Sequence, residues 1–208
     1  TQVREHSKGA SLFGYTKLYG QVPGGQAEYL RVPEAQYGPI KVPEGPRDDR
    51  FVYLSDVLPT AWQAVQYASV PDGGSVAVIG LGPIGDMSCR IAEQQGAGKV
   101  IGIDLVPERL KRAIDRGYET FDVSRHGDEE LAEALRAITD GRGPDAVIDA
   151  VGMEAHGAPL GRLAQTMAGL LPDAVAEKMI EKAGVDRMAA LHLAITLVRR
   201  GGTVSISG

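Results

Sequence analysis

The chain has 208 residues, of which 43% are hydrophobic and 24% are charged, proportions that are typical of a globular protein and exclude a disordered or fibrous one. Its formal net charge of −5 leaves no basic surface for a nucleic acid or an anionic membrane, so we expect neither as a partner. No apolar run reaches the roughly 20 residues that cross a bilayer, and residues 1–8 lack the apolar core of a signal peptide, so we expect a soluble, cytoplasmic protein.

The first 55 residues are rich in glycine and proline and contain short alternating runs, of which residues 26–32 are an example. Such a pattern predicts short strands and turns in a small β-rich lobe that is not a complete domain. From residue 55 to residue 70 the apolar residues recur at helical spacing instead, and Pro59 falls in the first turn, where proline is tolerated. A helix there would connect the lobe to the rest of the chain.

After a turn signal at residues 71–74, short β-branched runs alternate with longer amphipathic ones. We predict strands over 75–79, 99–104, 120–123 and 146–150, with helices over 83–95, 107–116 and 129–140 between them. Strands that are almost entirely apolar belong in a parallel sheet that is covered on both faces. The predicted fold class is therefore α/β, with a doubly wound parallel sheet of the Rossmann type.

Residues 152–200 keep a helical pattern for longer than one crossover connection needs, and Pro172 and Gly184 mark breaks within it. We interpret this span as an insertion of two or three helices. A final strand is predicted over residues 203–207.

A glycine-rich sequence directly follows the first strand of the predicted sheet and opens the helix after it. It consists of Gly80, Leu81, Gly82, Pro83, Ile84 and Gly85, a G-x-G-x-x-G match whose place between strand and helix makes it informative. Gly80 permits the tight turn, Gly82 lets the backbone approach a pyrophosphate, and Gly85 allows the helix to pack closely on the strand. The first amides of the helix and the positive end of its dipole then face the phosphates.

Asp104 ends the second strand of the predicted sheet, about 20 residues past the loop, where an acid can accept hydrogen bonds from the ribose hydroxyls of an adenosine. A carboxylate there repels a 2′-phosphate and favours NAD over NADP. The alternative is that Asp104 caps the next helix, in which Pro107 suits the first turn. S-adenosylmethionine enzymes hold adenosine with a similar loop and acid, but the third glycine and the strand over 203–207 favour a dinucleotide.

Four stretches, together with the helical span before residue 201, resemble the medium-chain, zinc-dependent alcohol dehydrogenases. The stretches are GGQAEY at 24–29, SDVLPT at 55–60, GLGPIG at 80–85 and DAVG at 149–152. They are similar in particular to the glutathione-independent formaldehyde dehydrogenase and dismutase branch. The resemblance implies that residues 1–55 are part of a GroES-like catalytic lobe and that residues 56–208 are an NAD-binding Rossmann domain without its last strand.

The same resemblance implies a catalytic zinc ion and places one of its ligands at Asp56, just before the helix over 55–70. A threonine that touches the nicotinamide follows four residues later in the family and maps onto Thr60. Zinc accepts a carboxylate oxygen, and a catalytic zinc has three protein ligands and one open position. Spacing alone allows another interpretation, in which Ser55 or Asp56 is the N-cap of the helix.

The other two zinc ligands of the family, a cysteine and a histidine, and its four-cysteine structural zinc lobe have no match in this sequence. The single cysteine, Cys89, falls in an apolar-periodic stretch and is expected to be a buried core residue, not a substitute ligand. None of the four histidines matches a ligand position. The zinc site is therefore expected to be incomplete, and this chain alone is expected to be inactive.

Further cofactor contacts are implied by position in the family. Arg109 would lie along the adenosine ribose, while Val151, Ser207 and Gly208 would approach the nicotinamide. Each has an ordinary alternative: Arg109 fits a solvated helix residue, Val151 fits a core residue at a strand end, and the last two fit a turn.

For the intact enzyme the resemblance implies hydride transfer between NAD and a small alcohol or aldehyde, formaldehyde among them, with zinc polarising the substrate oxygen. It also implies a homo-oligomer. The alternatives are a zinc-independent quinone-type reductase of the same superfamily, a non-catalytic nucleotide-binding fragment and a methyltransferase. Asp56 and Asp104 argue against the reductase, and cofactor binding would separate the others, because the fold alone does not determine function.

Overall fold

The computed structural model describes residues 12–14, 21–33, 35–152 and 189–207. The chain divides into two compact units, Thr1–Arg47 and Asp48–Gly208. In the described part of the chain, no helix is long and apolar enough to cross a membrane.

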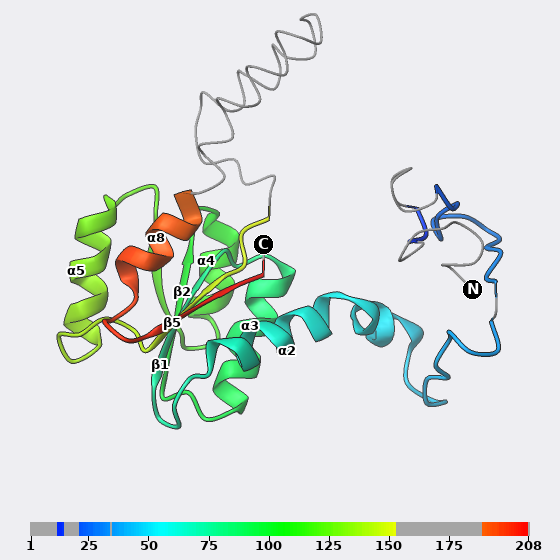
Figure 1. The fold of residues 1–208 in the computed structure, drawn as a ribbon, viewed down its shortest axis with the longest axis horizontal. Helices are drawn as coiled ribbons and strands as arrows, with labels where there is room; N and C mark the ends of the chain where they lie inside the picture. Colours follow the sequence, from blue (N-terminus) through cyan, green and yellow to red (C-terminus); the bar gives the residue numbers. More distant parts are fainter. Residues whose placement is uncertain (1–11, 15–20, 34, 153–188, 208) are drawn as a thin grey trace, which may run out of the picture. The chain divides into compact units, whose positions relative to one another are not determined.

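The larger unit is built on a parallel sheet of five strands in the order β3-β2-β1-β4-β5 (Figure 1). The strands are β1 (Ser75–Ile79), β2 (Lys99–Asp104), β3 (Glu119–Asp122), β4 (Ala146–Asp149) and β5 (Thr203–Ile206). The chain runs outward from β1 to β3 on one side and then continues with β4 and β5 on the other, so the strand order reverses between β1 and β4. The predicted doubly wound α/β fold is confirmed, and its reversal point is where such sheets bind ligands.

Helices cover both faces of this sheet (Figure 1). One face packs against α2 (Val57–Ala68), α3 (Pro83–Gln94) and α4 (Pro107–Ile114), and the other against α5 (Asp128–Ile138) and α8 (Ala189–Leu197). Within β1, Val76 and Val78 belong to the first core, whereas Ala77 and Ile79 belong to the second. Successive side chains of a strand point to opposite faces, so a strand that is covered on both sides is apolar throughout.

The predicted helices and strands of this unit are found within a few residues of their expected bounds. Two helices end earlier than predicted, and residues with left-handed backbone conformation explain both cases. Helix α4 ends at Ile114, and Gly117 follows with a φ of +88°. Helix α5 ends at Ile138, because Asp140 and Gly141 have φ values of +53° and +77°, which a right-handed helix cannot contain. Helix α8 lies within the predicted helical insertion, of which residues 153–188 lie outside the described residues.

The smaller unit differs from the expectation in its secondary structure. The strand predicted over residues 26–32 is not formed, and the described residues of this unit contain one isolated bridge, between Phe13 and Val22. A strand needs a neighbour for its backbone hydrogen bonds, and Tyr29 in the middle of this run is 90% exposed. The larger unit begins with a 3-10 helix, η2 (Asp48–Ser55), ahead of α2. A catalytic lobe over residues 1–55 remains a prediction.

Candidate cofactor site

Residues that the sequence marks as cofactor contacts lie at the carboxyl edge of the sheet. Gly80 follows β1, Asp104 ends β2, Val151 lies two residues after β4, and Ser207 follows β5. The carboxyl ends of parallel strands meet at one edge, so the fold brings these four positions together around the reversal point. Gly208, the remaining predicted contact, lies outside the described residues.

The three glycines of the loop meet three different steric requirements. Gly80 has a φ of +86°, and a Cβ there would lie 3.0 Å from the carbonyl oxygen of Ala150. A Cβ on Gly85 would overlap the carbonyl oxygen of Gly80, so α3 can pack against the loop only where a side chain is absent. A Cβ on Gly82 would meet none of the described residues within 4 Å. The space beside Gly82 is therefore open to an incoming group.

Helix α3 begins at this open space. Its N-cap is Gly82, which has no side chain to cap the helix, and Pro83 occupies the first turn. An α-helix leaves its first amides without an acceptor of its own, and here these include the amides of Ile84 and Gly85. Unpaired amides and the positive end of the helix dipole together attract an anion. The local geometry is therefore suited to a phosphate group.

Asp104 ties the end of β2 to the glycine loop. The residue is 6% exposed, and its Oδ2 accepts a hydrogen bond of 2.6 Å from the backbone amide of the buried Leu81. Its Oδ1 accepts hydrogen bonds from the amides of Leu105 and Val106 at 2.7 and 2.8 Å, and Nη1 of Arg109 lies 3.5 Å from Oδ2. Val106, the N-cap of α4, makes no side-chain cap hydrogen bond. Asp104 therefore shapes the turn before α4 and holds the loop, instead of occupying the cap position.

A second arginine of α4, which the sequence did not single out, contacts the loop. Arg112 donates from Nη2 to the carbonyl oxygen of Leu81 at 3.0 Å and from Nε to Oδ1 of Asp86, in the first turn of α3, at 3.2 Å. Arg116 also pairs with Asp86. The residues that Arg112 contacts lie 31 and 26 positions away in the sequence. The helical spacing of Arg109, Arg112 and Arg116 was the one signal that could have found this cluster.

Asp149 is another buried acid at this edge that the sequence did not mark as a site residue. It ends β4, is 6% exposed and accepts at Oδ1 a hydrogen bond of 3.0 Å from the amide of Val151. Burial raises the pKa of its carboxyl above the usual value, and the hydrogen bond from Val151 offsets only part of this rise. The side chain therefore fixes the backbone of a predicted nicotinamide contact while carrying an unfavourable charge.

We expect Asp149→Asn to raise the melting temperature at neutral pH by a few degrees. The pKa of the Asp149 carboxyl is higher in the folded chain than in the unfolded one. The free energy of unfolding therefore falls as the pH rises from the unfolded pKa to the folded pKa, and above the folded pKa the full loss of stability is present. Asparagine removes the charge and keeps an oxygen for the amide of Val151. Melting curves at neutral pH and at about pH 3.5, where most of the acid is protonated in both states, check this. An equal shift at both pH values would contradict it.

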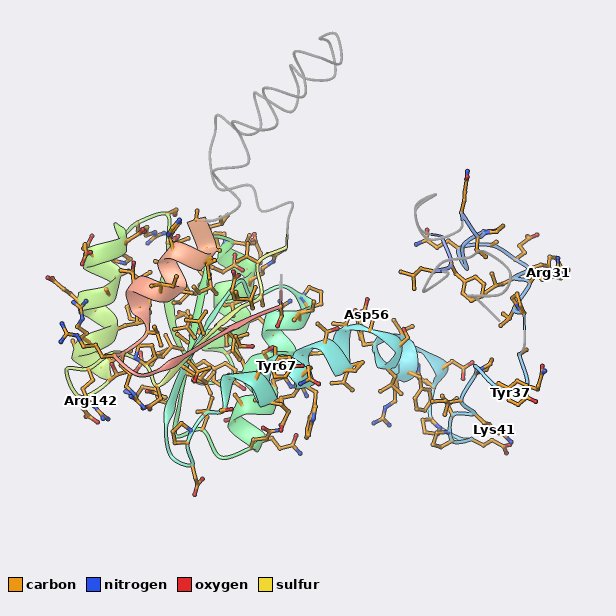
Figure 2. The ribbon with its side chains drawn as sticks, in the orientation of Figure 1. Arg31, Tyr37, Lys41, Asp56, Tyr67 and Arg142 are labelled. Carbon is orange, nitrogen blue, oxygen red and sulfur yellow. The ribbon has the colours of Figure 1, made fainter. Side chains whose placement is uncertain are left out.

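Helix α2 and the end of β5 form a groove of about 370 Å³. It is lined by Pro59, Thr60, Gln63, Ala64, Tyr67, Ile206 and Ser207. Asp56 lies near the start of α2 and Tyr67 near its end (Figure 2). The groove brings Thr60 and Ser207, two predicted nicotinamide contacts that are far apart in the sequence, into one surface.

Asp56 occupies the N-cap position of α2, but its side chain makes no cap hydrogen bond. Its Oδ1 instead accepts a hydrogen bond of 2.9 Å from the hydroxyl of Thr60. Among the described residues, no three histidine, cysteine, aspartate or glutamate side chains come together to hold a metal. Asp56 offers one oxygen ligand, and these residues by themselves do not fit a complete zinc centre.

Cys89, the single cysteine, is 1% exposed within α3. Burial, and after it the charge of Asp86, raise the pKa of its thiol to about 12. A thiol with such a pKa keeps its proton at neutral pH and is a poor metal ligand. The prediction of a buried core cysteine is confirmed.

Similarity to known proteins covers nearly the whole chain. The family model described as zinc-binding dehydrogenase matches residues 83–158. A zinc-type alcohol dehydrogenase-like protein of Bacillus subtilis (strain 168) is 36% identical over 100% of this chain and 51% of its own length. A glutathione-independent formaldehyde dehydrogenase of Pseudomonas aeruginosa is 37% identical over 73% of this chain and 38% of its own.

Among solved structures, the alcohol dehydrogenase TADH from Thermus sp. ATN1 has a TM-score of 0.71 and 32% identity over 94% of this chain and 47% of its own. The chain spans about half the length, or less, of the relatives that it matches.

Proposed function

Since the chain belongs to the zinc-type alcohol dehydrogenase family, we propose that it binds NAD at the carboxyl edge of its sheet and that the whole protein interconverts a small alcohol and its aldehyde. The observation that carries this proposal is the open space beside Gly82, where α3 begins with unpaired amides next to the buried, loop-bound carboxylate of Asp104. When bound, NAD accepts or supplies the hydride.

The adenosine half of the cofactor would be held by the loop and the end of β2. Amides between Gly82 and Gly85 would bind the pyrophosphate. Asp104 would accept hydrogen bonds from the ribose hydroxyls, with Arg109 beside it. A 2′-phosphate would lie against this carboxylate and be repelled by it, so we propose NAD over NADP.

The nicotinamide half would lie beyond β4 and β5, next to α2. Val151 and Ser207 would contact the ring, and Thr60 would orient it from the groove that it shares with Ser207. The largely apolar wall of this groove would keep water away from the ring. Gly208 is proposed as a further contact of the nicotinamide ring because of its position in the sequence, next to Ser207.

Asp56 is proposed as one zinc ligand of the whole protein, with Thr60 donating a hydrogen bond to one of its two oxygens. The other ligands would come from outside the described residues. A small aldehyde such as formaldehyde is the proposed substrate class, supported by the 37% identity to a formaldehyde dehydrogenase. The cytoplasmic location and the homo-oligomer remain predictions.

Calorimetric titration of the chain with NADH, NADPH and S-adenosylmethionine tests the proposal. We expect NADH to bind most tightly, NADPH to bind more weakly, and S-adenosylmethionine not to bind, because the loop and Asp104 together suit a dinucleotide with a free 2′-hydroxyl. Binding of S-adenosylmethionine without NADH, or no binding of NADH at all, would contradict the proposal.

A further inference from the structure

A second cavity lies at the opposite edge of the sheet from the candidate cofactor site, where β4 and β5 begin. Its volume is about 710 Å³. It is lined by Arg136, Gly141, Arg142, Thr196, Val198, Arg199 and Arg200, and is called the arginine pocket below. Arg142 lies in the loop between α5 and β4 (Figure 2). Strands of four to six residues separate the two edges by about 15 Å, so the arginine pocket is distinct from the loop of Gly80.

Four arginines line this cavity, and no acidic residue is among its lining residues. Arg199 is the only one with an ion-pair partner among the described residues: its Nε donates to Oδ1 of Asp145 at 2.6 Å. In the same part of the chain, Arg136, Arg142 and Arg200 make no side-chain hydrogen bond or ion pair. Three unpaired cations thus share one pocket in a chain whose net charge is −5.

The backbone around the arginine pocket is tightly fixed. The loop after α5 passes through left-handed residues at Asp140, Gly141 and Gly143. A Cβ on Gly143 would lie 2.8 Å from the carbonyl oxygen of Leu197 at the end of α8, so the two loops touch there. The amide of Arg199 donates to the carbonyl of Pro144 at 3.0 Å. A left-handed non-glycine residue costs on the order of 1 kcal/mol, and the packing holds it in place. The arginines therefore extend from a rigid frame.

We propose that the arginine pocket binds a small, multiply charged phosphate compound. Guanidinium groups recognise phosphate oxygens through paired, charge-assisted hydrogen bonds. The volume lies within the roughly 300–1,000 Å³ of small-molecule sites and exceeds what one phosphate needs. A single phosphate carries at most about two charges at neutral pH, fewer than the three unpaired cations. A compound with two or more phosphate groups matches both the charge and the volume.

Calorimetric titration of the chain with inorganic tripolyphosphate tests this proposal. The double variant Arg142→Gln with Arg200→Gln removes two exposed guanidiniums from the pocket, and we expect the Kd to rise at least about tenfold. The matched control, Arg90→Gln with Arg125→Gln, removes two exposed arginines of the same unit that do not line the pocket, and the same net charge. Its Kd should change by less than about twofold. Melting curves of both variants establish that they fold.

Repeating the titration with saturating NADH separates the two sites. We expect the Kd for tripolyphosphate to be unchanged, because the cofactor site lies at the other edge of the sheet. Displacement of tripolyphosphate by NADH would assign the binding to the glycine loop and overturn the proposal. Absence of binding to the unmodified chain, or an equal loss of affinity in the two double variants, would overturn it as well.

Discussion

Replacing Gly85 with alanine is expected to lower the free energy of unfolding of the larger unit by at least about 3 kcal/mol. The new Cβ would overlap the carbonyl oxygen of Gly80, a backbone atom that no rotamer change can move away. Either α3 or the turn after β1 would have to shift, and both belong to the centre of the fold, since β1 is the middle strand of the sheet. Chemical denaturation monitored by circular dichroism measures the loss in the free energy of unfolding.

Gly82→Ala is the matched control, because it makes the same chemical change three residues earlier in the same loop. Gly82 has an ordinary φ of −66°, and a Cβ there meets no atom of the described part of the chain within 4 Å, so the stability should change by less than about 1 kcal/mol. Its effect should fall on NADH binding, because the methyl group would occupy the proposed approach to the pyrophosphate. Equal stability of the two variants would show that the packing of Gly85 does not limit the fold.

The sheet could be predicted from the sequence because its signal is local. The apolar runs at β1 and β2 and the glycines after β1 each need a window of a few residues, and all were placed within a few positions. The prediction of a strand over 26–32 was wrong because it also rested on a local signal alone. Alternation is a property of the segment alone, whereas a strand also needs a partner, and none of the described residues pairs with this run.

The candidate sites are harder to predict because they join residues that are far apart in the sequence. Asp149 was read as part of a strand, and its contact with Val151 was visible only in the folded chain. Arg142 and Arg200 lie on separate loops and line the same pocket only because β4 and β5 are neighbours. Asp56 is a different case. The sequence pattern explains a lone carboxylate before a helix equally well as an N-cap or as a metal ligand, so the proposed metal role rests on the family resemblance.

We expect Asp104→Asn to weaken NADH binding about 100-fold and to leave NADPH binding unchanged or tighter. Asparagine keeps an acceptor oxygen but removes the charge, so the two hydrogen bonds to the ribose hydroxyls would together lose about 2–3 kcal/mol, the difference between charged and neutral acceptors. The like charge that opposes a 2′-phosphate would disappear at the same time. Arg109, whose side chain is 44% exposed and lies 3.5 Å from Asp104, would then be available to pair with that phosphate. Fluorescence titration with the two reduced coenzymes measures both constants.

Asp115→Asn provides the charge-matched control for this variant. Asp115 pairs with Lys111 on the solvent side of α4 and is 59% exposed, so its replacement should change either affinity by less than about twofold. Asp104 also holds the amides of Leu81, Leu105 and Val106, and a collapsed loop would weaken both coenzymes alike. A parallel loss of NADH and NADPH affinity would therefore mean that Asp104 supports the loop but does not bind the ribose hydroxyls. A loss of NADH affinity with NADPH affinity unchanged or tighter would indicate the ribose contact, because the two coenzymes differ only in the 2′-phosphate.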